Sequence, residues 1–217
     1  MIRSRARSGL AAALALLAAA VLAVATLGGT AAQAAPASQA APASTPLPPV
    51  ASVDLARYLG RWYQVAAIPQ PYQLQCARNS TAVYTAVDAD TIGVRNTCST
   101  WLGPLTDLLL GTVTGKADVL DPTTNAQLRV SFDGIPSFGD TSTPNYVITY
   151  LAPDYSFAIV GDPARQSGFV LSRTPALQGI TWSQVRQIVE ARGYDSCRFT
   201  VTPVAGGRQD RVRLCTL

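Results

Sequence analysis

Histidine is absent from this chain of 217 residues. Its absence removes the side chain that most often acts as a general base or a metal ligand near neutral pH. The sequence also contains no G-x-S-x-G nucleophile motif and no glycine-rich phosphate-binding motif. Isolated carboxylates such as Asp118 and Asp133 are expected to form turns or strand ends. We therefore expect no enzymatic activity, no catalytic residue and no cofactor.

A stripe of basic residues is also missing, although the formal net charge is +4. Arg3, Arg5 and Arg7 supply three of the 17 basic residues, so the rest of the chain carries 14 against 13 acidic residues. A near-neutral domain of this kind is a poor candidate for nucleic-acid binding, and we expect none.

The three arginines precede an apolar run over residues 10–27 and the small-residue exit Ala32-Gln33-Ala34. This order predicts a secretory signal peptide over residues 1–34, with a retained membrane anchor as the alternative. No cysteine lies near the exit and no Arg-Arg pair precedes it, so we expect neither lipid attachment nor twin-arginine export. Residues 35–50, rich in Pro, Ala and Ser, are expected to form a disordered arm before one domain at 51–217.

After the arm, short strands alternate with turn residues. Because few of them are continuous apolar runs, a parallel sheet is disfavoured. Short connections favour an all-β, up-and-down antiparallel barrel, which leaves no exposed sheet edge. We expect eight strands, over residues 61–68, 79–87, 91–98, 112–120, 126–132, 145–151, 155–161 and 168–173.

One helix is expected after the eighth strand, and we expect it to pack outside the barrel. Apolar residues recur at helical spacing between residues 182 and 189, Thr181 and Gln184 fit a capping box, and Gly193 fits a C-terminal cap. Residues 198–204 and 208–215 flank Gly206-Gly207 and predict a last hairpin.

Only four cysteines are present, and none stands in a C-x-x-C pair. Without that spacing and without histidine, no zinc or other metal site is expected. An even number in an exported chain favours two disulfides. We favour Cys76–Cys98 and Cys197–Cys215, because antiparallel pairing brings each couple together, and a Cys76–Cys215 bond is the main alternative.

Three short motifs stand at strand ends: Gly60-x-Trp62, Asp154-Tyr155, and "LSRTP", which contains Arg173. In this order they resemble the three signatures of the lipocalin family. Longer stretches, such as "YLGRWYQVAAIP" and "AVYTAVDADTIGVRNTC", resemble the bacterial outer-membrane and apolipoprotein D-like branch between about Val53 and Val201. The bacterial members carry a lipid on an N-terminal cysteine, which this chain lacks.

The resemblance implies a structural role for the first and third signatures. Gly60 lets the backbone turn tightly, and Trp62 then closes one end of the barrel with Arg173 stacked on its ring. We interpret this arrangement as a plug, because no titratable partner stands beside it.

An eight-stranded barrel is wide enough to hold one small ligand. Alternation places Leu128, Val130 and Phe132 on one face of the fifth strand, and Tyr146, Ile148 and Tyr150 on one face of the sixth. Resemblance and strand parity together place further residues inside: Ala82, Tyr84, Val94, Asn96, Ala117 and Phe169. This lining, apolar with several hydroxyls and one amide, suits a fatty acid or a lysophospholipid, the ligand class that the resemblance implies. No buried cation is expected to pair with the ligand.

By lipocalin topology, the loops at residues 70–78, 99–111, 133–144 and 162–167 ring the open end. The second loop is unusually apolar for a connection. It is expected either to form a lid that contacts ligand, or to touch a lipid surface transiently, or to pack locally against an extended fourth strand. Its apolar residues are Trp101, Leu102, Leu105, Leu108, Leu109 and Leu110.

The sequence therefore predicts a secreted protein, a monomer or weak dimer, that carries, stores or scavenges a small hydrophobic ligand. A secreted module that binds a macromolecule through its rim loops is the alternative. An enzyme built on the same barrel is a further one.

Overall fold

The computed structural model describes residues 45–136 and 140–217. Within this part, no helix has the length and apolar character needed to span a bilayer. The elements are α1 (Leu55–Tyr58), β1 (Gly60–Ala67), η1 (Pro71–Gln73), β2 (Cys76–Ala86), β3 (Thr91–Thr100), α2 (Pro104–Leu110), β4 (Thr112–Val119), β5 (Gln127–Phe132), β6 (Tyr146–Leu151), β7 (Phe157–Gly161), β8 (Gly168–Ser172), α3 (Trp182–Ala191), η2 (Ser196–Arg198), β9 (Thr200–Val201) and η3 (Leu214–Thr216).

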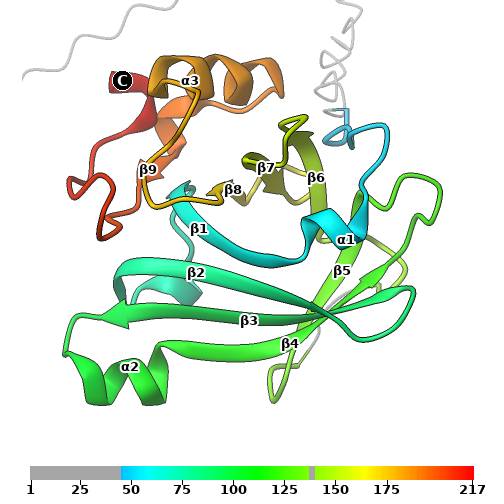
Figure 1. Cartoon of the computed structure of the whole chain (residues 1–217), viewed down its shortest axis with the longest axis horizontal. Helices are drawn as coiled ribbons and strands as arrows, with labels where there is room; N and C mark the ends of the chain where they lie inside the picture. The colour runs from blue at the N-terminus through cyan, green and yellow to red at the C-terminus, as the bar shows by residue number, and fades with distance from the viewer. Residues whose placement is uncertain (1–44, 137–139) are drawn as a thin grey trace, which may run out of the picture. The chain divides into compact units, whose positions relative to one another are not determined.

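The first eight strands pair in chain order, and every neighbouring pair is antiparallel. Because β1 pairs with β8 on one side and with β2 on the other, the sheet closes into a barrel. Figure 1 shows the long strands β2, β3 and β4 as one layer, with β1 above them. β9 adds a short ninth strand on the end of β1. The predicted barrel of eight strands with an extra strand is confirmed.

Alternation along the strands divides the apolar side chains between two cores. One core lies inside the barrel and contains Trp62, Leu128 and Ile148. The other lies outside it, where Val185 and Val189 of α3 pack against the outer face of the sheet. Helix α3 begins with the predicted capping box, in which Thr181 accepts from the Gln184 N–H and Gln184 accepts from the Thr181 N–H.

Residues 45–50 were predicted to belong to a disordered arm, and this prediction is wrong for them. The Leu47 side chain is buried, and its N–H donates to the Pro163 carbonyl at 2.9 Å. The Val50 N–H donates to the Ile148 carbonyl at 2.9 Å. Leu47 supplies apolar surface that an Ala/Ser arm lacks, and the sheet offers partners to the extended backbone. The predicted signal peptide at 1–34 lies outside the described residues.

The predicted C-terminal hairpin forms only in part. Its two arms run antiparallel, but β9 is two residues long and pairs with the other arm through the single bridge Thr200–Arg213. On its other edge, β9 pairs with β1. The disulfide Cys197–Cys215 joins the two short helices η2 and η3 at the base of these arms.

Candidate functional site

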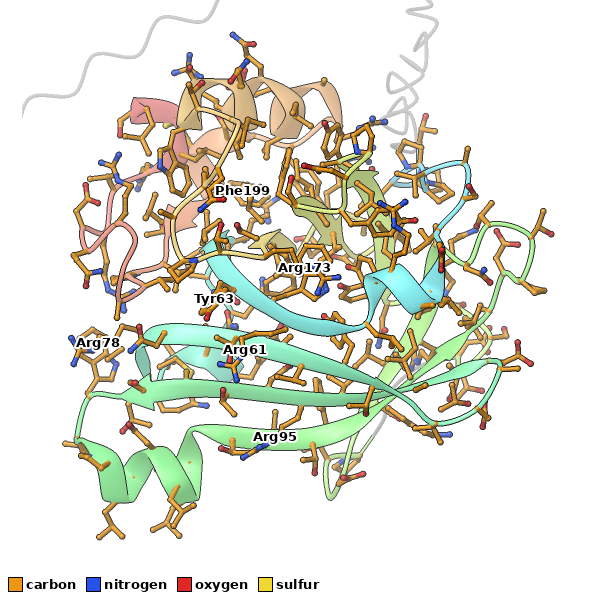
Figure 2. The ribbon with its side chains drawn as sticks, in the orientation of Figure 1. Arg61, Tyr63, Arg78, Arg95, Arg173 and Phe199 are labelled. Atoms are coloured by element: carbon orange, nitrogen blue, oxygen red, sulfur yellow. A yellow bond between two sulfur atoms is a disulfide. The ribbon has the colours of Figure 1, made fainter. Side chains whose placement is uncertain are left out.

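The closed end of the barrel is built around Trp62, whose side chain has no exposed surface. Gly60 precedes it with φ of +92°, a conformation that favours glycine. The Arg173 guanidinium lies 3.7 Å from the Trp62 ring centroid, and Figure 2 shows this side chain alongside β1. Arg173 also donates to the Leu59 carbonyl at 2.8 Å and to the Arg57 carbonyl at 2.6 Å. The lipocalin resemblance implies this plug.

The second signature supports the same end from outside. Tyr155 adopts φ of 63°, and its hydroxyl accepts the Asp54 N–H at 2.9 Å. The Arg57 guanidinium lies 3.9 Å from the Tyr155 ring centroid. The Asp154 carboxylate accepts from the Ser156 hydroxyl, which lowers its pKa. Asp154 therefore forms a turn, and Tyr155 anchors α1.

Three tyrosine hydroxyls meet inside the barrel above this plug. Tyr146 bonds with Tyr58 at 2.8 Å and with Tyr84 at 3.1 Å. Burial raises the pKa of Tyr84 to about 12 and raises those of Tyr58 and Tyr146 well above the ordinary value. All three hydroxyls are therefore protonated at physiological pH. They form a neutral, polar floor.

Tyr58 belongs to this floor but was not predicted. It precedes the first strand, where the period-two pattern has not begun. The available signal was Asp54, which caps α1 by accepting the Arg57 N–H at 3.3 Å. An Asp followed by "LARY" is a possible helix start of one turn, and the turn points Tyr58 into the barrel core.

Most of the predicted lining residues lie in the core inside the barrel. Those that are buried there are Ala82, Tyr84, Val94, Ala117, Leu128 and Ile148. Those that pack against the same core but keep part of their surface accessible are Val130, Phe132, Tyr146 and Phe169. These four inward-facing side chains are therefore not fully covered by protein atoms.

Tyr150 was expected beside Tyr146 and Ile148, and this placement is wrong. In the β6–β7 pairing, Ile148 faces Val160 but Tyr150 faces Ile159, so β6 has one extra residue between them. This bulge turns Tyr150 to the outer core, where its ring lies 4.9 Å from the Phe157 ring.

Asn96 faces Ala82 across the β2–β3 pair and points into the barrel. Its side-chain oxygen is buried and has no hydrogen-bond partner among the described residues. A buried acceptor without a donor is costly, so the position favours a ligand that donates a hydrogen bond.

A cavity of about 160 Å³ lies at the open end. Its lining includes Gln64 and Ser80. Each lies two residues along its strand from the paired residues Trp62 and Ala82. The Gln64 amide donates to the Thr202 hydroxyl at 3.0 Å and accepts from Gln73 at 2.9 Å. These polar mouth residues were not predicted, because Gln64 interrupts an otherwise apolar strand and Thr202 comes from the C-terminal segment.

Trp101 also lines this mouth cavity, at the rim of the barrel. Its side chain is 63% exposed, and its indole N–H donates to the Leu74 carbonyl at 2.9 Å. The loop that follows forms helix α2. It was expected to form a lid, to touch a lipid surface, or to pack locally in an extended fourth strand. The last of these is excluded, because β4 begins at Thr112.

A larger hollow of about 400 Å³ lies outside the barrel, between the outer faces of β1–β3 and the C-terminal segment. Arg61 and Tyr63, labelled in Figure 2, form part of its lining. Its hydroxyls bond one another, as in Thr81–Thr97 at 2.7 Å. It is separate from the predicted interior site.

The disulfides are Cys76–Cys98 and Cys197–Cys215, the favoured pairing, so Cys76–Cys215 is excluded. The part of the chain that the structure describes contains no group of three or more potential metal-binding His, Cys, Asp or Glu residues.

Comparison with known proteins identifies the family. A lipocalin-like domain matches residues 53–204. Temperature-induced lipocalin-1 of Arabidopsis thaliana is 32% identical over 157 residues, which cover 71% of this chain and 81% of that protein. Outer membrane lipoprotein Blc of Vibrio cholerae is 30% identical over 153 residues, which cover 70% and 82%.

The fold is similar to that of apocrustacyanin C2, with a TM-score of 0.51, 22% identity, and coverage of 69% of this chain and 78% of that one. Domain match, sequence identity and fold agree, and the chain belongs to the lipocalin family.

Proposed function

We propose that this lipocalin is an exported carrier that holds one single-chain lipid, such as a fatty acid or a lysophospholipid, inside the barrel. The observation that carries the proposal is the closed barrel whose inward-facing apolar residues keep accessible surface. Val130, Phe132 and Phe169 combine both properties. Inward-facing apolar surface that protein atoms leave uncovered favours a hydrophobic guest.

The polar groups inside favour a lipid with an uncharged, hydrogen-bonding end. The Asn96 oxygen accepts, and the tyrosine floor both donates and accepts. None of the buried side chains in the described ranges carries a charge. A carboxylate would therefore enter without a paired cation, which is unfavourable. A fatty acid would bind in its protonated form or with its carboxylate at the mouth.

Export is supported by two disulfides, which persist in oxidising compartments. The basic and apolar leader at residues 1–34 is the second support. We therefore propose that the protein acts outside the cell, and we expect a monomer or weak dimer.

The proposal is tested by titrating the full chain with a fluorescent fatty acid. We expect one saturable site and displacement by unlabelled lipids. A monoacylglycerol should displace the probe at least as well as a fatty acid of equal chain length, because the interior offers no cation. Failure of every single-chain lipid to displace the probe would favour the alternative, an interaction module acting through its rim loops. Product formation from a bound lipid would favour an enzyme.

Two neighbouring residues of β4 provide a matched pair of variants. Val113 faces Asn96 and points inward, whereas Thr112 faces Thr97, which lines the outer hollow. Val113→Trp should lower probe affinity at least about tenfold by filling the interior, and Thr112→Trp should change it less than about twofold. Equal effects of the two variants would mean that the probe binds outside the barrel.

A further inference from the structure

An apolar surface stands at the open end of the barrel, beside the mouth. It consists of Tyr72, Leu74, Trp101 and the five leucines of residues 102–110, and we call it the rim patch. Its side chains are 57% to 81% exposed. They make up eight of the ten exposed large hydrophobic residues in the described parts of the chain, so the exposure is concentrated at one place. Concentrated apolar exposure of this kind marks an interaction surface.

Helix α2 supplies four of the eight side chains of the rim patch, because its leucines face solvent and its polar residues face the barrel. Its polar residues face the barrel: the Thr106 hydroxyl donates to the Gly103 carbonyl at 2.8 Å, and the Asp107 carboxylate accepts the Thr100 N–H. Its leucines point to solvent, with Leu105 at 73% and Leu108 at 75% exposure. A helix that merely covered the barrel would show the opposite arrangement. Figure 1 shows α2 at the end of the barrel, beyond β3 and β4.

Hydrogen bonds join the two loops of the rim patch into one surface. The Trp101 indole N–H donates to the Leu74 carbonyl at 2.9 Å, and the Gln75 amide donates to the Leu110 carbonyl at 3.4 Å. The Cys76–Cys98 disulfide ties β2 to β3 next to both loops. The exposed side chains are therefore held in place by the backbone beneath them.

Two basic groups lie beside the rim patch on its outer side, and one acidic group, Asp162, lies near Tyr72 at its edge. The Arg211 guanidinium lies 5.1 Å from the Trp101 ring centroid and is exposed, as is Arg78 on β2. Asp107, the acidic residue of the α2 loop, is turned inward and bonded. An indole beside a cation, next to exposed leucines, is the composition of a segment that lies at a membrane interface.

We propose that the rim patch docks on the surface of a phospholipid bilayer that contains anionic headgroups. A protein partner would require directional contacts, and protein interfaces carry a hydrogen bond for every one to two hundred Å². The rim patch offers few, because Thr106 and Asp107 are turned inward. A lipid surface requires only apolar burial and attraction of Arg78 and Arg211 to its phosphates. Docking would place the mouth of the barrel at the source of a lipid ligand.

The test measures flotation of the full chain with vesicles of phosphatidylcholine containing about 30% phosphatidylglycerol. The triple variant Leu105→Ser, Leu108→Ser, Leu109→Ser should reduce the bound fraction at least about tenfold. Val87→Ser, which removes an equally exposed residue at 63% exposure from the β2–β3 turn, should leave it unchanged. Any lipid binding by residues 10–27 is common to all variants, so the comparison isolates the rim patch.

Trp101 supplies an independent readout. Its emission should shift to the blue with vesicles and be quenched by brominated lipids, and this signal should disappear in Trp101→Phe. The proposal is overturned if wild-type emission does not respond, or if the triple variant floats like wild type. It is also overturned if the chain dimerises through these leucines and ignores vesicles. Displacement of a fluorescent fatty acid should survive the triple variant, so this proposal and the carrier function fail separately.

Discussion

The two ends of this barrel arrange their apolar and polar side chains in opposite ways. At the closed end, aromatic rings are covered by cations, with the Arg173 guanidinium on Trp62 and the Arg57 guanidinium on Tyr155. At the open end, the polar side chains of α2 point inward and its leucines face solvent. The closed end therefore stabilises the fold, whereas the open end keeps its apolar surface available for contact.

Substitutions of Trp62 and Trp101 should give the largest difference in stability between the two ends. Trp62 has no exposed surface and Trp101 is 63% exposed. Trp62→Ala should lower the free energy of unfolding by about 3–5 kcal/mol, because it leaves a cavity under Arg173. Trp101→Ala should change it by less than about 1 kcal/mol, mostly from the lost bond to Leu74. Denaturant unfolding measures both. Similar losses in the two variants would break the comparison between the ends.

Alkaline pH should weaken the closed end of the barrel. Burial raises the pKa of Tyr84 to about 12, so the fold favours the neutral phenol. The corresponding stability is complete below the unfolded-state pKa of about 10 and is lost as the pH rises through about 12. For Tyr84 the full loss is about 3 kcal/mol.

Denaturant unfolding at pH 9 and at pH 11.5 measures the part of this loss that occurs below the folded-state pKa of about 12. Tyr84→Phe should be less sensitive to alkali than wild type, because Phe does not ionise. If Tyr84→Phe loses as much stability as wild type between these pH values, ionisation of Tyr84 does not contribute to the alkali sensitivity of the fold.

The closed end was largely predictable from the sequence, and the open end was not. Period-two alternation and the three signatures located the strands and placed Trp62, Arg173 and most lining residues. Alternation failed at Tyr150, because one extra residue in β6 reverses every side chain beyond it. It also gave no information on Leu47, which is buried through long-range contacts of an otherwise featureless arm.

The α2 leucines illustrate a different limit. A run of leucines ordinarily indicates burial, and the sequence alone left a lid, a lipid contact and local packing as alternatives. The outcome depends on Thr106 and Asp107, whose bonds to Thr100 and Gly103 fix which side of the helix faces the barrel. Short polar residues in a loop have many possible partners, so their partners become known only from the fold.

Two substitutions within α2 test why its polar residues face the barrel and its leucines face solvent, and we expect them to have the smallest effects. Thr106→Val keeps the shape of the side chain but removes a hydroxyl that bonds with Gly103 and Thr100, so it should destabilise α2 by about 1 kcal/mol. The neighbouring Leu105→Gln should change stability by less than about 0.5 kcal/mol, because the side chain is 73% exposed.

Hydrogen exchange of the Gly111 amide, which donates to the Asp107 carbonyl, reports opening of α2 without unfolding of the barrel. Faster exchange in Thr106→Val than in Leu105→Gln is expected. The reverse order would mean that the leucines, and not the inward polar pair, hold α2 in place, and the open end would then be stabilised by the same kind of packing as the closed end.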